Sequence, residues 1–219
     1  NTSSELMGQF VSVERGKTRM SINEYIAKQF ANPRGIGGRI VMAVMNRQNA
    51  QMYEETERLL RPRNDDIILD IGCGNGIMLE RIAHACDCHL IGTDISEDAL
   101  EIAKRRLAGT NVELLRCPVD DTPLEDATVD KALTINTIYF WEDLASGFEE
   151  IARVLKPEGI FISTHYTNRA LESYSHTQFG YRMRTEQEVV SAAEIAGFTV
   201  QIKSIMDGRA YCVVGRRQA

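Results

Sequence analysis

Ile67-Ile68-Leu69-Asp70-Ile71-Gly72-Cys73-Gly74-Asn75-Gly76 joins a short apolar run to a cluster of glycines. The apolar run predicts a buried β-strand, and the helical pattern over residues 77–86 predicts that the chain turns directly into a helix. Glycine has no Cβ atom, so it lets the backbone turn tightly and lets a ligand lie close against it. The segment therefore predicts a strand–turn–helix unit with a ligand-binding turn at its centre.

The same alternation continues along the chain after Arg61-Pro62. It predicts right-handed βαβ units and a parallel sheet covered by helices on both faces. Only the four residues Met206 to Arg209 separate the last two apolar runs, which predicts an antiparallel hairpin. The expected fold class is α/β, with a doubly wound, seven-stranded, mostly parallel sheet. The predicted strands are 67–71, 89–93, 112–115, 129–135, 159–165, 198–205 and 210–215, and the predicted helices are 77–86, 97–107, 143–155 and 185–196.

Residues 1–60 contain no strand-like run. Ser21 and Glu24 form a capping-box pattern for a short helix. Apolar residues from Ile40 onward recur at helical spacing and predict one long amphipathic helix that ends near Leu60. We therefore expect an N-terminal helical extension or lid over 1–60 and an α/β domain over 61–219.

Composition narrows the classes of function. The chain has 219 residues and a formal net charge of -6, so it lacks the basic field that non-specific nucleic-acid binding requires. Its apolar runs are far shorter than the roughly 18 residues of a membrane span, and Asn1 to Val13 lacks a signal-peptide pattern. The five cysteines predict reduced thiols in a cytoplasmic protein. Cys86 and Cys88, close to His84 and His89, leave a soft metal site as the alternative, although we expect no metal.

Two carboxylates flank the glycine turn. Asp94 lies eighteen residues beyond Gly76, at the end of the second predicted strand, where it can accept hydrogen bonds from both ribose hydroxyls. Its alternative role is to cap the helix that starts at Ser96. Asp70 suits an amino group and would repel a diphosphate, and Ile77 occupies the position where the Gly-x-Gly-x-x-Gly dinucleotide fingerprint needs its third glycine. An amino acid joined to a nucleoside fits both carboxylates, and S-adenosylmethionine is such a molecule.

With these motifs the sequence resembles the class I S-adenosylmethionine-dependent methyltransferases, particularly the small bacterial type. The resemblance covers about residues 40–219. Residues 70–76 look like the family's first motif, residues 130–141 are similar to the fourth strand and the turn that faces the transferred methyl, and residues 153–159 resemble the connection to the fifth strand. The resemblance implies a Rossmann-like methyltransferase fold, with S-adenosyl-L-methionine as cofactor and S-adenosyl-L-homocysteine as product.

The resemblance also assigns roles to individual residues. Pro118 and Val119 stand where family members often carry an acidic and then a small residue, so Asp120 and the Val119 amide become the adenine contacts, beside Ile95. A turn asparagine without a ligand is the alternative for Asn136. The expected cofactor-binding residues are Asp70, Gly72, Cys73, Gly74, Gly76, Asp94, Ile95, Val119, Asp120 and Asn136.

The methyl acceptor is expected to be a small molecule, neither nucleic acid nor membrane, and the sequence leaves the oligomeric state open. A thiol, phenol or amine acceptor can need a base, and the candidates are His165, His176 and Tyr139. The expected acceptor pocket draws on the N-terminal helices and the loop over 166–184, and its candidate residues are Tyr25, Met45, Met52, His165, Tyr166 and Tyr181. The competing functions are a non-catalytic nucleoside-binding scaffold or sensor and an NAD-dependent oxidoreductase.

Overall fold

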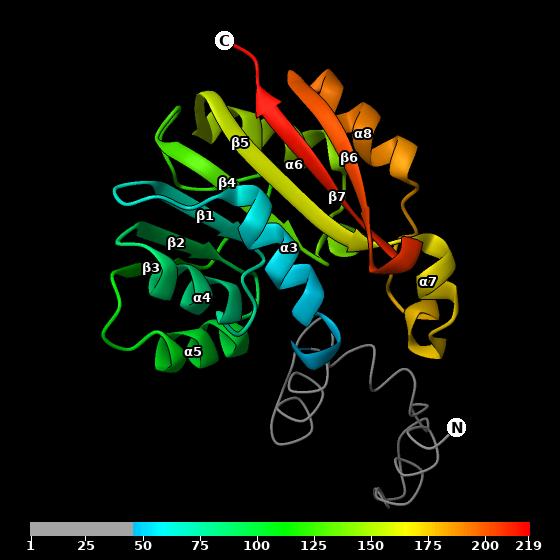
Figure 1. Ribbon diagram of the computed structural model, residues 1–219, viewed down its shortest axis with the longest axis horizontal. Helices are drawn as coiled ribbons and strands as arrows, with labels where there is room; N and C mark the ends of the chain where they lie inside the picture. Colours follow the sequence, from blue (N-terminus) through cyan, green and yellow to red (C-terminus); the bar gives the residue numbers. More distant parts are fainter. Residues whose placement is uncertain (1–45) are drawn as a thin grey trace, which may run out of the picture.

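The computed structural model describes residues 46–219, which form one seven-stranded sheet with helices packed on it (Figure 1). The strands are β1 (Ile67–Ile71), β2 (His89–Thr93), β3 (Val112–Leu115), β4 (Val129–Ile135), β5 (Leu155–Tyr166), β6 (Phe198–Ile205) and β7 (Ala210–Arg217). The helices are α3 (Ala50–Leu60), α4 (Ile77–Ala85), α5 (Glu97–Arg106), α6 (Leu144–Val154), α7 (Asn168–Glu172) and α8 (Glu186–Ile195), with short 3-10 turns η1 (Ile138–Phe140), η2 (Ser175–Gln178) and η3 (Met206–Gly208).

The strand order is β3-β2-β1-β4-β5-β7-β6. β1 pairs in parallel with β2 and with β4, while β7 runs antiparallel to both of its neighbours, β5 and β6. The predicted fold class is confirmed, including the C-terminal hairpin. The topology reverses direction beside β1, where the chain leaves β3 at one edge and returns as β4, and open α/β sheets bind ligands at such a point.

Helices cover both faces of the sheet, with α3, α4 and α5 on one face and α6 and α8 on the other (Figure 1). The central strands are buried because neither of their faces meets water, and Leu69, Ala132 and Phe161 have no exposed surface. None of the helices formed by residues 46–219 has the length and apolar character that a bilayer span requires.

Several segments differ from the sequence-based expectation, among them β7, which continues two residues beyond its predicted end to Arg217. β5 starts at Leu155 and is longer than the predicted strand, and the segment expected to be irregular contains α7 and η2. The predicted helix over residues 40–60 is interrupted by a turn at Asn49, so α3 starts at Ala50. Residues 1–45, including the Ser21 capping box, lie outside the described part of the chain.

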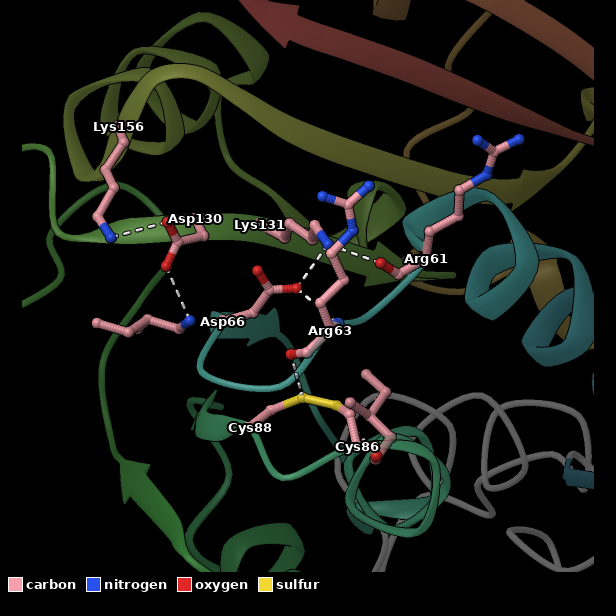
Figure 2. Close-up of polar contacts among 10 residues, drawn as sticks. Arg61, Arg63, Asp66, Cys86, Cys88, Asp130, Lys131 and Lys156 are labelled. Atoms are coloured by element: carbon pink, nitrogen blue, oxygen red, sulfur yellow. Dashed lines mark hydrogen bonds and ion pairs between the residues drawn. A yellow bond between two sulfur atoms is a disulfide. The ribbon is translucent and has the colours of Figure 1, made fainter.

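Ion pairs and a cysteine pair join the loops at the amino ends of the strands, at the edge opposite the glycine turn (Figure 2). Lys131 contacts Asp66 at 2.5 Å and the carbonyl oxygen of Arg61 at 2.7 Å. Cys86 and Cys88 form a disulfide, which corrects the prediction of reduced thiols at these two positions. Cys86 has extended backbone angles, and side chains two residues apart in an extended segment point to the same side, so the two sulfur atoms meet.

Candidate functional site

A cavity of about 500 Å³ opens at the carboxyl ends of β1, β2 and β4, beside the glycine turn. Helix α3, the loop after β3, the end of β5, helix α7 and the turns η1 and η2 also contribute to its wall. The cavity therefore lies where the strand order reverses, as expected for a ligand site in an open α/β sheet.

The three glycines of the turn all adopt positive φ angles, which residues with a Cβ rarely adopt, but they serve different purposes. A Cβ at Gly72 would collide with the side chain of Thr137, whereas a Cβ at Gly74 would meet no atom within 4 Å. Gly72 and Gly74 line the cavity. Gly76 does not; a Cβ there would lie 3.0 Å from Leu107 and 3.1 Å from Ala103, so Gly76 allows α4 and α5 to pack closely.

Asp70 lines the cavity at the end of β1 with only 3% of its surface exposed. No hydrogen bond from any residue of the described chain, 46–219, reaches its carboxyl group. Burial, together with the nearby Asp94, raises the pKa of Asp70 to about 8. A buried carboxyl that lacks a donor and faces a cavity is suited to a positively charged ligand group.

Asp94 holds the glycine turn from the end of β2. Its Oδ2 accepts a hydrogen bond from the Gly74 amide at 2.9 Å, and its Oδ1 accepts one from the Ser96 amide at 2.8 Å. Burial raises its pKa, although these backbone bonds oppose the shift. Ser96 itself caps α5 by accepting from the Ala99 amide, so the helix-cap role belongs to Ser96. Because each carboxylate oxygen can accept a second bond, Asp94 retains acceptor capacity toward the cavity.

The far end of the cavity carries the residues expected to contact adenine. Ile95, Val119 and Asp120 line it, and Ile95 is 62% exposed. Cys73, the remaining residue of the glycine turn on the predicted cofactor list, also lines the cavity, and its amide donates to the Thr93 carbonyl at 2.9 Å.

Asn136 and Tyr139 belong to a network that links β4, β5 and α3. Asn136 lines the cavity with a φ of 59° and donates to the sulfur of Met52 at 3.4 Å. The Tyr139 hydroxyl accepts from the Tyr166 amide at 2.6 Å, and the Tyr166 hydroxyl donates to Asn49 at 2.9 Å. Burial raises the pKa of Tyr139 well above its ordinary value, which favours the protonated phenol over the phenolate that a base would need.

The two candidate histidines occupy different environments. His176 lies in η2 and lines the cavity, half-buried, and burial lowers its pKa. His165 is fully buried and does not line the cavity; its ring packs against Tyr211, with ring centroids 4.9 Å apart. Burial also lowers the pKa of His165 to about 3. Because His165 does not line the cavity, the structure places this predicted base away from the ligand site.

Sequence reasoning missed one wall of the cavity, which α3 and the preceding turn provide. Asn46, Asn49 and Tyr53 line it. Their spacing of three and then four residues places them on one helical face. The sequence-based prediction of this helix used only the spacing of apolar residues and so did not identify this face. Among the predicted acceptor residues, Tyr166 and Tyr181 line the cavity, Met52 is buried behind it, and Tyr25 and Met45 lie outside the described residues.

Comparison with known proteins agrees with the fold and the position of the cavity. A family model described as a methyltransferase domain matches residues 69–163, the segment from β1 to β5 that contains the glycine turn, Asp94 and Asn136. Over this segment the chain is similar to the class I methyltransferases. An uncharacterized methyltransferase, YdaC of Bacillus subtilis, is 29% identical to this chain over 178 residues, which are 80% of this chain and 97% of the relative.

Two solved structures share the methyltransferase fold. The putative methyltransferase in a complex with the Haloferax volcanii activator Trm112 has a TM-score of 0.76 and 18% identity, covering 93% of this chain and all of its own. A geranyl diphosphate C-methyltransferase from Streptomyces coelicolor, solved with S-adenosyl-L-homocysteine, has a TM-score of 0.68 and 17% identity, covering 79% of this chain and 78% of its own. Two further curated methyltransferases match over about half of their length, 50% and 49%.

Proposed function

We propose that this protein transfers a methyl group from S-adenosylmethionine to a small-molecule acceptor by in-line displacement. The observation that carries the proposal is the combination around one cavity of Asp70, buried and without a hydrogen-bond donor among residues 46–219, open space at Gly74, and Asp94. The bound S-adenosyl-L-homocysteine of the Streptomyces coelicolor structure supports the choice of cofactor.

The residues present fit this cofactor at both of its ends. Asp70 would bind the amino group, and Asp94 would accept hydrogen bonds from the ribose hydroxyls through its remaining lone pairs. Val119 and Ile95 would contact the adenine ring. When bound, S-adenosylmethionine supplies a methyl group that is already activated by a positively charged sulfur.

The other cavity residues would align the acceptor and take up its proton. Tyr139, Phe140 and Tyr181 form an aromatic wall, which excludes water and limits the orientations of a bound acceptor. His176 faces the same cavity and, because burial lowers its pKa, is neutral near pH 7 and able to accept a proton. We therefore retain His176 as the base among the predicted candidates.

The first test is cofactor binding. A ligand that binds only the native state raises its stability, so an excess of S-adenosyl-L-homocysteine at about 100 times its Kd should add about 2.7 kcal/mol. Thermal melting with S-adenosyl-L-homocysteine, and with NAD as the control, measures this effect. An unchanged melting temperature with S-adenosyl-L-homocysteine, or stabilisation by NAD, would refute the cofactor assignment. If the protein binds the cofactor but forms no S-adenosyl-L-homocysteine with any acceptor of a panel, the result would favour the alternative function, a non-catalytic nucleoside-binding scaffold or sensor.

Asp94→Ala tests the ribose contact. We expect a loss in cofactor binding free energy of about 1.5 to 3 kcal/mol, because bonds to a charged group disappear. The variant also leaves the Gly74 and Ser96 amides without their acceptor, so its unfolding free energy should fall.

Asp143→Ala is the matched control for Asp94→Ala, because Asp143 accepts from the Ser146 amide at 2.9 Å at the exposed start of α6, outside the cavity. It should lose stability without losing affinity. Calorimetric titration with S-adenosyl-L-homocysteine measures both variants, and equal affinity in Asp94→Ala and wild type would exclude the ribose contact.

A further inference from the structure

We propose that the methyl acceptor is an uncharged, flat ring compound that carries a weakly acidic hydroxyl group. This inference rests on the proposed function, since it concerns the part of the cavity that the cofactor would leave open. It follows from the shape of the aromatic wall, from the distribution of charge around it, and from the placement of His176.

Rings from three segments meet at the acceptor end of the cavity. Tyr181 stacks on Tyr139 with ring centroids 5.6 Å apart and meets Phe140 edge to face at 4.8 Å. His176 lies between Tyr181 and Tyr174, with centroids 6.1 Å and 5.7 Å away. All five rings line the cavity. Contiguous ring faces and edges favour a planar guest, because aromatic rings pair best in offset-stacked or edge-to-face arrangements.

Hydrogen bonds connect this wall to the neighbouring elements. The Arg182 amide donates to the Tyr139 carbonyl at 3.0 Å, and Thr177 donates to the Leu171 carbonyl at 2.8 Å. The loop that carries Tyr174, His176 and Tyr181 is therefore anchored to both η1 and α7. A preformed wall loses little conformational entropy when it binds a guest.

The described residues bring no cationic side chain into the lining of this cavity. Of the residues that line it between positions 46 and 219, none is a lysine or an arginine. Two arginines beside the wall donate to backbone oxygen: Arg182 and Arg184 contact the Trp141 carbonyl at 3.1 Å and 3.3 Å. Arg209 donates to the hydroxyl of Tyr174 at 2.7 Å. A carboxylate or phosphate acceptor would lose its hydration here without gaining an ion pair from the lining that residues 46–219 provide, which is costly.

A cationic acceptor is disfavoured by the reaction. The donor sulfur carries a positive charge, and an ammonium group has no lone pair with which to attack a methyl group. A hydroxyl on a planar ring enters the cavity uncharged and has lone pairs with which to attack the methyl group. The bond from its oxygen to the methyl carbon forms as the bond from sulfur to that carbon breaks. The hydroxyl proton passes to the neutral His176 ring in the same step. The sulfur keeps the electron pair, and the imidazolium releases its proton to water afterwards.

The experiment compares three probes that share one ring system: naphthol, naphthoic acid and naphthylmethylamine. Each is titrated by calorimetry into the full chain saturated with S-adenosyl-L-homocysteine. We expect naphthol to bind at least tenfold more tightly than the other two, and to be methylated when S-adenosylmethionine replaces the product. Equal or tighter binding of naphthoic acid or of the amine, or no binding of naphthol, would overturn the acceptor class. Failure of S-adenosyl-L-homocysteine to bind at all would instead overturn the proposed function.

Variants of the wall separate specific binding from surface adsorption. Tyr181→Ala should weaken naphthol binding by about three- to tenfold, the effect of losing one aromatic pair, with S-adenosyl-L-homocysteine affinity unchanged. Tyr181→Phe keeps the ring and should bind naphthol as wild type does. Phe179→Ala is the matched control, since Phe179 lies two residues away, is 38% exposed and does not line the cavity. If Phe179→Ala weakened naphthol binding as much as Tyr181→Ala, the wall would not be the acceptor site.

Discussion

Asp70→Asn is expected to make the ligand-free protein more stable while removing most of its affinity for S-adenosyl-L-homocysteine. The Asp70 carboxyl has a pKa of about 8 in the folded protein, against an ordinary value of 3.8. Between these values the folded state holds a proton that the unfolded state has released, so the stability of the wild-type protein falls as pH rises. Asparagine is neutral at every pH and avoids this loss.

The gain in unfolding free energy of Asp70→Asn should increase with pH by about 1 kcal/mol per unit between roughly pH 4 and pH 8. Denaturant unfolding of the ligand-free protein at several pH values measures it. Asp130→Asn is the control of opposite sign, because Asp130 pairs with Lys156 at 2.7 Å and accepts from the Ile67 amide at 2.9 Å (Figure 2). These bonds lower the pKa of Asp130. Asp130→Asn should therefore destabilise the protein above about pH 4 and cost less as pH falls.

The affinity loss in Asp70→Asn has the same cause. A cationic amino group favours the ionised form of Asp70, so cofactor binding near pH 7 should release close to one proton from the wild-type protein. Calorimetry in two buffers of different ionisation enthalpy detects this proton, and the proton release attributable to Asp70 should disappear in Asp70→Asn. Unchanged affinity and unchanged proton release would show that Asp70 does not bind the amino group.

His176→Gln is expected to lower kcat by about 10²-fold or more, the usual contribution of a positioned base. Burial lowers the pKa of His176, so the wild-type rate should decrease only when pH falls below the ordinary histidine range. The variant should lack this decrease and should bind S-adenosyl-L-homocysteine as tightly as wild type.

His84→Gln is the matched control for His176→Gln, because His84 is exposed at the end of α4, away from the cavity. Initial rates with the best acceptor, measured from pH 5 to pH 9, decide the outcome. A pH profile shared by His176→Gln and wild type would remove His176 from the reaction.

The sequence was sufficient to predict most of the sheet, because alternating buried strands and amphipathic helices are repeated, local signals. β1, β2, β3, β4 and β6 have the predicted bounds. α7 and η2 were missed because helices of one turn have no periodicity to detect. Asp70 and Asp94 could be placed at the cavity because the carboxyl ends of neighbouring parallel strands meet at one edge of the sheet.

His165 shows why the rest could not be predicted. It stands near the carboxyl end of β5, on the expected ligand side, but β5 continues to Tyr166 and pairs His165 with Tyr211 of β7. The direction of a side chain at a strand end depends on where the strand stops and on what its neighbour covers. Asn49 and Tyr53 line the cavity although the sequence did not predict them as site residues. Only the packing of α3 against the sheet determines which helical face meets the cavity.

Trp141 is the single tryptophan among the 219 residues of the chain, and it lines the cavity. Its indole Nε1 donates to Thr137 at 3.0 Å, and its ring meets Phe148 edge to face at 5.7 Å. Fluorescence excited selectively in the indole band therefore comes from one place in the unlabelled protein, the wall of its binding cavity. Stopped-flow mixing can use this emission to time ligand arrival and product departure without an added dye.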